Sequence, residues 1–139
     1  ATERWSPSAP AGPRLVSVFH LDSHRRKGAD SLIRAVAELS REIPDLTLDI
    51  YGRGAPQAFL DLSRLIAESE ARGRVTLKGP VAHEKVHGLL GSYGAFVLPS
   101  RRESYGMVFV EALFAGIPIL HPRGWGVDRL FADEMVGYA

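Results

Sequence analysis

The chain has 139 residues, which fits one domain with a real hydrophobic core and is too short for two ordinary domains. Its 45% hydrophobic and 24% charged residues are typical of a globular protein, and a formal net charge of +1 gives no field suited to nucleic acid. Cysteine is absent, the five histidines show no metal-ligand spacing, and nothing resembles a signal peptide or a spanning helix. We therefore expect a cytoplasmic protein with no nucleic-acid partner and no transmembrane segment.

The first thirteen residues combine proline, glycine and small side chains, a composition typical of linkers. The chain also begins without methionine. We expect residues 1–13 to be the remnant of an interdomain linker and residues 14–139 to form the folded domain.

From Arg14 onward, apolar runs of strand length alternate with helical segments across short connections. The expected strands are Leu15 to Phe19, Leu46 to Tyr51, Val75 to Leu77, Ala95 to Leu98, Ile117 to Leu120 and, as a possible sixth, Met135 to Tyr138. The expected helices are Gly28 to Ile43, Pro56 to Ala71, His83 to Tyr93, Gly106 to Ala115 and Val127 to Phe131. This alternation predicts an α/β fold, a Rossmann-like doubly wound parallel sheet ordered 3-2-1-4-5-6.

The first of these helices carries apolar residues at helical spacing, which predicts a buried stripe. The stripe consists of Leu32, Ile33, Val36, Leu39 and Ile43.

In that strand order the topological switch lies between the first and fourth strands, and ligands bind beyond the carboxyl ends of the strands there. The loop His20 to Lys27 should then face the loop Pro99 to Tyr105. Lys27 precedes Gly28 at a helix start, where an ammonium can lie over a phosphate and glycine lets the backbone approach closely. The alternative is a solvated surface lysine.

Two carboxylates, Glu103 and Glu111, lie where an apolar strand is expected to end and an apolar helix to follow. A charge in such a setting is costly unless polar groups satisfy it. With Glu103 just before the helix, the two positions can border one pocket without touching, which suits a ligand longer than a single sugar. Alternatively, Glu103 only steadies the helix dipole, or Glu111 points to solvent.

These residues resemble the nucleotide-sugar-binding half of the retaining glycosyltransferases of family 4, the group 1 glycosyltransferases with the GT-B fold. The family's Glu-x7-Glu motif looks like Glu103 to Glu111, within a Pro-Ser-x-x-Glu-x-aromatic-Gly pattern. Lys27-Gly28 is similar to its phosphate-binding Lys-Gly, and Gly52-Arg53-Gly54, which we interpret as a turn, is similar to its Gly-x-Gly step. The resemblance covers Arg4 to Tyr138.

The resemblance implies a role for each matching position. Lys27 would hold the donor diphosphate, helped by backbone N–H groups at Ser104, Tyr105 and Gly106. Glu111 would accept the ribose hydroxyls, and Glu103, as the catalytic-site carboxylate, would bind hydroxyls of the transferred sugar.

Two further positions follow from the same resemblance. The loop from Gly79 to Val81 would receive the nucleobase. Where the family has arginine after the first strand, this chain has His20, and its loop is two residues longer, so His20, Arg25 or Arg26 is expected to supply that donor.

The resemblance also implies the reaction, which is transfer of a glycosyl unit from a nucleoside diphosphate sugar with retention and without a metal. The acceptor-binding half of a GT-B enzyme has no counterpart in the chain, so the isolated chain should bind the donor and transfer no sugar. One alternative is another GT-B-like sugar enzyme, such as a nucleotide-sugar epimerase. Another is a non-catalytic nucleotide-binding domain.

Overall fold

A single parallel sheet organises the computed structural model, which describes residues 13–25, 27–98, 115–120 and 137–138. The strands are β1 (Arg14–Val18), β2 (Thr47–Tyr51), β3 (Val75–Gly79), β4 (Ala95–Val97), β5 (Ile119–Leu120) and β6 (Gly137–Tyr138). They lie in the order β3-β2-β1-β4-β5-β6, and every neighbouring pair is parallel. The predicted strand order is therefore confirmed, and no antiparallel pair occurs among these strands.

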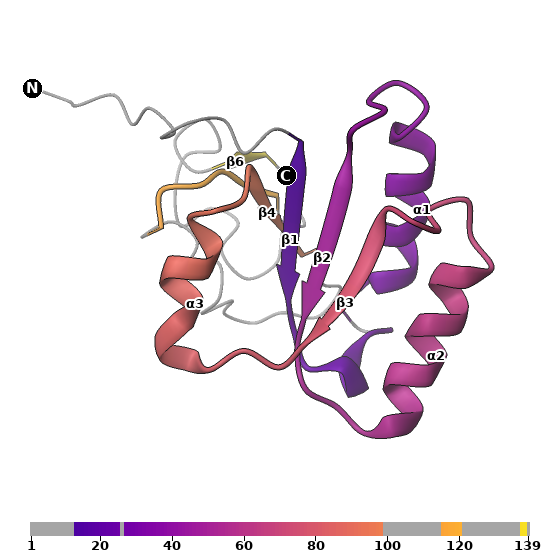
Figure 1. Cartoon of the computed structure of the whole chain (residues 1–139), viewed down its shortest axis with the longest axis horizontal. Coiled ribbons are helices and arrows are strands. Elements are labelled where there is room, and N and C mark those ends of the chain that lie inside the picture. Colours follow the sequence, from indigo (N-terminus) through magenta and orange to yellow (C-terminus); the bar gives the residue numbers. More distant parts are fainter. Residues whose placement is uncertain (1–12, 26, 99–114, 121–136, 139) are drawn as a thin grey trace, which may run out of the picture.

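Helices cover both faces of the sheet (Figure 1). Among the described residues they are α1 (Ala29–Leu39), α2 (Pro56–Ala67) and α3 (His83–Leu90), with a short 3-10 helix, η1 (Leu21–Ser23), after β1. Figure 1 shows α1 and α2 on one side of the sheet and α3 on the other. Right-handed crossovers require this, because the chain moves outward from β1 to β3 and then returns past β1 to β4.

The core lies between the sheet and the apolar stripes of the helices. Leu48 and Ile50 of β2 are completely buried, and α2 presents Ala58, Leu62 and Ile66 at four-residue spacing. The stripe predicted on α1 is correct at Leu32, Ile33 and Val36.

The opposite face of β2 carries a polar network that reaches Tyr93 in the connection between α3 and β4. The Tyr93 hydroxyl donates to Asp49 at 2.6 Å and lies 2.9 Å from the Tyr51 hydroxyl. Since its one proton goes to Asp49, Tyr51 must donate to Tyr93. Burial, reinforced by the hydrogen bond to Asp49, raises the pKa of Tyr93 above its ordinary range, so the hydroxyl remains a donor. The Asp49 carboxylate is thereby satisfied in a half-buried position.

All three helices end earlier than the apolar pattern predicts. They were expected to reach Ile43, Ala71 and Tyr93 but end at Leu39, Ala67 and Leu90. Near each end a serine hydroxyl donates to the carbonyl three residues back, and such bonds compete with helix propagation. These are Ser40 to Ala37 at 2.8 Å, Ser69 to Ile66 at 2.8 Å and Ser92 to Leu89 at 2.7 Å.

The early end of α1 also corrects two predicted core residues. Leu39 is the last residue of α1 and is 44% exposed, and Ile43, which lies beyond the end of the helix, is 39% exposed. The helix predicted over Val127 to Phe131, and all but the last residue of that over Gly106 to Ala115, lie outside the described residues.

The loop after β1 packs directly on the connection after β2. The N–H groups of Phe19 and Leu21 donate to the carbonyls of Tyr51 and Arg53 at 3.1 and 2.9 Å. A Cβ at Gly52 would lie 1.8 Å from the Phe19 carbonyl oxygen, and one at Gly54 would lie 2.7 Å from the Leu21 Cβ. The Gly-x-Gly step therefore lies in the connection between β2 and α2, and its glycines admit the neighbouring loop at backbone contact.

We expect Gly52→Ala to lower the free energy of unfolding by about 1–3 kcal/mol, the usual cost of forcing an extra group into a filled site. Urea unfolding followed by circular dichroism measures this. Gly88→Ala is the matched control, because a Cβ there meets nothing within 4 Å. Within α3 that change should raise stability by about 0.5–1 kcal/mol. Equal midpoints for Gly52→Ala and the unaltered chain would contradict the close approach.

Candidate functional site

The sheet places its topological switch between β1 and β4, as the sequence predicted. The connection after β1 leads towards one edge of the sheet and the connection after β4 leads towards the other. A crevice is therefore left between them at the carboxyl ends of these two strands. On the described side of the crevice lies the β1–α1 loop, residues 19–28, of which residue 26 is not described. This loop carries three of the predicted site residues, His20, Arg25 and Lys27.

The β1–α1 loop is folded back on itself by its own backbone. Leu21 is buried, and the N–H of Lys27 donates to the carbonyl of Ser23 at 2.9 Å. Gly28 caps α1 with a φ of 76°, a left-handed backbone that glycine adopts without strain. The Lys-Gly step therefore has a conformational reason as well as the chemical one, since a side chain at position 28 would be strained.

His20 lies at the start of the loop with half of its side chain exposed. Its Nδ1 accepts the backbone N–H of Asp22 at 3.3 Å, so a neutral imidazole carries its proton on Nε2. The Asp22 carboxylate lies 3.7 Å from the same Nδ1 and would pair with a protonated ring. In either protonation state His20 can present an N–H donor.

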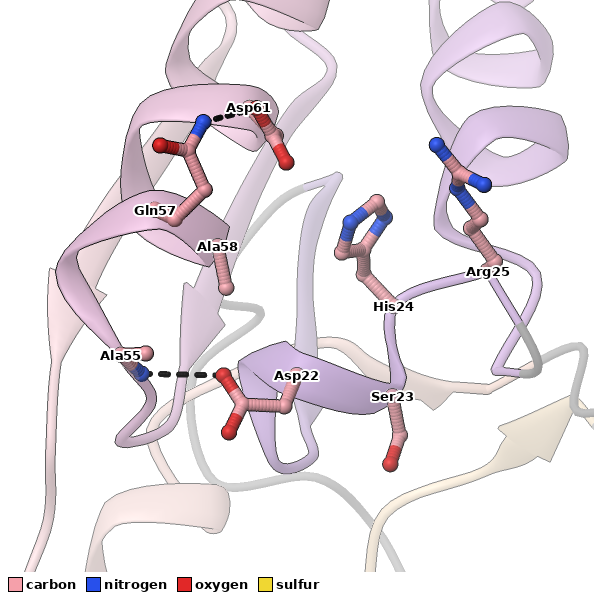
Figure 2. A pocket seen from close by; sticks show the side chains of 8 residues that line it. All are labelled: Asp22, Ser23, His24, Arg25, Ala55, Gln57, Ala58 and Asp61. Atoms are coloured by element: carbon pink, nitrogen blue, oxygen red, sulfur yellow. Dashed lines mark hydrogen bonds between the residues drawn. The ribbon is translucent and has the colours of Figure 1, made fainter.

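Arg25 lies on a different side of the loop, in a shallow depression of about 500 Å³ between the loop and the start of α2. Figure 2 shows His24 standing between Arg25 and α2. The depression continues between α1 and α2, where Arg25 shares the lining with Asp30, Asp61 and Glu68. Arg64 lies in the same lining, and His20 lines neither part of the depression.

Gly79 is the last residue of β3, and Val81 follows it at the same edge of the sheet. Gly79 pairs with Tyr51, which pairs with Val18, so the three strands end in one row. The Gly79 carbonyl accepts the N–H of Gly52 at 2.9 Å, and Val81 is partly buried against the core. The structure therefore places Gly79 level with the β1–α1 loop but two strands away from it.

The other predicted site residues lie outside the described part of the chain. They are Glu103, Ser104, Tyr105, Gly106 and Glu111. Their roles stay predictions.

Asp22 is the residue that the sequence did not point to. Its Oδ1 accepts the N–H of Ala55 at 2.9 Å, across 33 residues of sequence. The only available signal was indirect, because neither Ala55 nor Ala58 has a side chain that can cap the start of α2.

The described residues lack two further features. They contain no cluster of three or more histidine or acidic side chains arranged to hold a metal. None of their helices combines the length and the apolar character needed to cross a membrane.

Nearly the whole sequence matches a known family. Residues 3–139 fit the family model described as glycosyl transferases group 1, and the chain belongs to this family. The predicted family is thereby confirmed at this level.

Curated relatives are similar to the chain over part of their length. The GtfA subunit of UDP-N-acetylglucosamine–peptide N-acetylglucosaminyltransferase from Streptococcus agalactiae is 34% identical over 132 residues, 95% of this chain and 22% of the relative. Alpha-D-kanosaminyltransferase from Streptomyces kanamyceticus is 34% identical over 111 residues, 80% and 28% of the two chains. D-inositol 3-phosphate glycosyltransferase from Arthrobacter sp. is 33% identical over 130 residues, 92% and 31%. The chain thus spans 22% to 31% of the length of these relatives.

Solved structures agree with this assignment. Pneumococcal O-GlcNAc transferase GtfA, in complex with UDP and GlcNAc, matches with a TM-score of 0.69 and 26% identity over 90% of this chain and 22% of that one. Sucrose-phosphate synthase from Thermosynechococcus elongatus matches with a TM-score of 0.77 and 28% identity, over 93% and 33%. WaaG, a glycosyltransferase of lipopolysaccharide biosynthesis, matches with a TM-score of 0.72 and 26% identity, over 91% and 33%. With the strand order described above, the predicted Rossmann-like half of a GT-B fold is confirmed.

Proposed function

We propose that the chain is the donor-binding domain of a retaining glycosyltransferase of family 4, which takes a nucleoside diphosphate sugar at the carboxyl ends of β1 and β4. The observation that carries the proposal is the Lys27-Gly28 step, which closes the β1–α1 loop beside the topological switch. The UDP bound to pneumococcal GtfA and the UDP-sugar in the name of the Streptococcus agalactiae relative support this class of ligand. Membership of a transferase family also favours this function over a nucleotide-sugar epimerase.

In this proposal the β1–α1 loop recognises the diphosphate. The Lys27 ammonium takes the phosphate oxygens, as charge-assisted hydrogen bonds are the strong ones. Of the candidates for the family's arginine we favour His20 over Arg25. The positions support this choice, because Arg25 lines the depression between α1 and α2, whereas His20 lies outside that depression with Nε2 left as a donor.

The remaining contacts come from the predicted positions elsewhere in the chain. Glu111 accepts the ribose hydroxyls, and Glu103 binds the transferred sugar. Backbone N–H groups at 104–106 stabilise the leaving diphosphate, the type of electrostatic help on which such transfers depend. The connection from Gly79 to Val81 receives the nucleobase.

Donor binding of this kind needs no metal, since the cations and N–H groups neutralise the diphosphate. We also propose a cytoplasmic location, because nucleotide sugars are the expected substrates and the chain has no cysteine framework. The acceptor would bind to a second half of the full enzyme, which the relatives' greater length supports.

Lys27→Ala should weaken binding of nucleoside diphosphates by about 10- to 100-fold, the range for losing a hydrogen bond to a charged group. The bare nucleoside presents no charge to the ammonium and should bind unchanged. NMR titration of the 15N-labelled chain with UDP, GDP, ADP and their nucleosides measures both. Lys85→Ala, on the exposed face of α3, is the control. His20→Ala should share the selective loss and Arg25→Ala should not, and equal losses for nucleoside and diphosphate would refute the role of Lys27.

Glu111→Gln should weaken nucleotide binding by about 1–3 kcal/mol through lost hydrogen bonds to the ribose, while the fold survives. The same titration measures affinity, and circular dichroism checks folding. Glu38→Gln, on the exposed side of α1, is the matched control and should change neither. An unfolded Glu111→Gln chain would instead make this carboxylate structural.

The isolated chain should transfer no sugar. Transfer needs an acceptor oriented against the sugar carbon and shielded from water, a contribution of about 7–11 kcal/mol from orientation that half a cleft does not supply. A radiolabelled donor assay with this chain as the only protein tests it. Transfer at ordinary enzymatic rates, about 1 to 1,000 per second, would show that one half suffices.

A further inference from the structure

Asp22 joins the β1–α1 loop to a helix that lacks its own cap. Its carboxylate oxygen Oδ1 accepts the N–H of Ala55, the N-cap residue of α2, at 2.9 Å (Figure 2). In a capping box this N–H is taken by a Glu or Gln side chain from the third helical residue. That residue is Ala58 here, so Asp22 performs the task from another segment of the chain.

The same residue holds His20. The backbone N–H of Asp22 donates to His20 Nδ1 at 3.3 Å, which leaves Nε2 as the outward donor. On either side, Leu21 is bonded to Arg53 and Ser23 accepts the N–H of Lys27, both at 2.9 Å. A movement of Asp22 away from α2 would therefore displace His20 and Lys27 together.

We propose that Asp22 is a positioning residue for diphosphate binding. Through its hydrogen bond to α2 it keeps His20 and Lys27 in their positions in the loop. This inference rests on the proposed function of the loop. It predicts that removal of the Asp22 side chain weakens diphosphate binding, whereas the loss of its negative charge would by itself strengthen binding. A carboxylate in the loop repels a bound anion, so its removal would by charge alone tighten diphosphate binding.

Two substitutions separate positioning from charge. Asp22→Ala removes both the carboxylate charge and the acceptor for Ala55. Asp22→Asn removes the charge but keeps a carbonyl oxygen that can accept the same N–H. Glu70→Gln is the matched control, because Glu70 is an exposed carboxylate that holds Arg41 at 2.7 Å near the far ends of α1 and α2.

The four chains, including the unaltered one, are titrated by NMR with UDP, GDP, ADP and the matching nucleosides. Asp22→Ala should weaken diphosphate binding about tenfold and leave nucleoside binding within about twofold, as for one lost charge-assisted interaction. Asp22→Asn and Glu70→Gln should both stay within about twofold of the unaltered chain. Tighter diphosphate binding by both Asp22 variants would show that Asp22 acts through its charge alone and would overturn the proposal. Equal weakening of nucleoside and diphosphate by Asp22→Ala, or no change, would equally overturn the proposal.

Amide hydrogen exchange without ligand keeps the test independent of binding. In Asp22→Ala the amides of Leu21 and Lys27 should exchange faster, with those inside α2 such as Leu62 unchanged, and Asp22→Asn should restore slow exchange. Unchanged exchange at Leu21 and Lys27 in Asp22→Ala overturns the positioning role even if the unaltered chain binds. A chain that binds none of the three diphosphates refutes the proposed function itself, whatever the exchange shows.

Discussion

The contact between the Phe19 carbonyl and the Gly52 backbone is the constraint around which this edge of the domain is arranged. Parallel strands end at one edge of a sheet, and their loops must share the space there. With 1.8 Å between the Phe19 oxygen and a Cβ at position 52, glycine alone lets the two chain segments meet. The hydrogen bonds from Phe19 and Leu21 then extend the β1–β2 ladder beyond the strands, so the loop begins from a fixed point.

The hydrogen bonds of the β1–α1 loop to β2 and α2 explain how so short a loop can be held in one conformation. Fixing the backbone of each residue costs about 1–2 kcal/mol in conformational entropy, which an exposed loop of ten residues does not recover by itself. Here the cost is shared, because bonds that the loop makes also satisfy the ends of β2 and α2. The Asp22–Ala55 bond serves both segments, so loosening the loop would also leave the start of α2 unsatisfied.

The sequence predicted the strand order well and the local endings poorly, for physical reasons. Strand order follows from apolar runs, short connections and right-handed crossovers, all of which are visible in one dimension. The helix ends depended on single serine hydroxyls, such as that of Ser40, that compete with the backbone. The partnership of Asp22 with Ala55, and the different surroundings of His20 and Arg25, depend on side-chain directions that no spacing in the sequence specifies.

The near-neutral charge of the chain decides how it can select a polyanion. With a net charge of +1, long-range attraction is weak, and at physiological ionic strength charges beyond about 8 Å are screened. On the proposed function, the Lys27 ammonium must therefore act at contact distance, where a pair near the surface is worth only about 1–4 kcal/mol. Enclosure by a second domain would exclude water and so strengthen the contact between the ammonium and the diphosphate, without adding new contacts. A loop already held in place by Gly52 and Asp22 gains most from such closure, because little of the added electrostatic energy is then lost in ordering it.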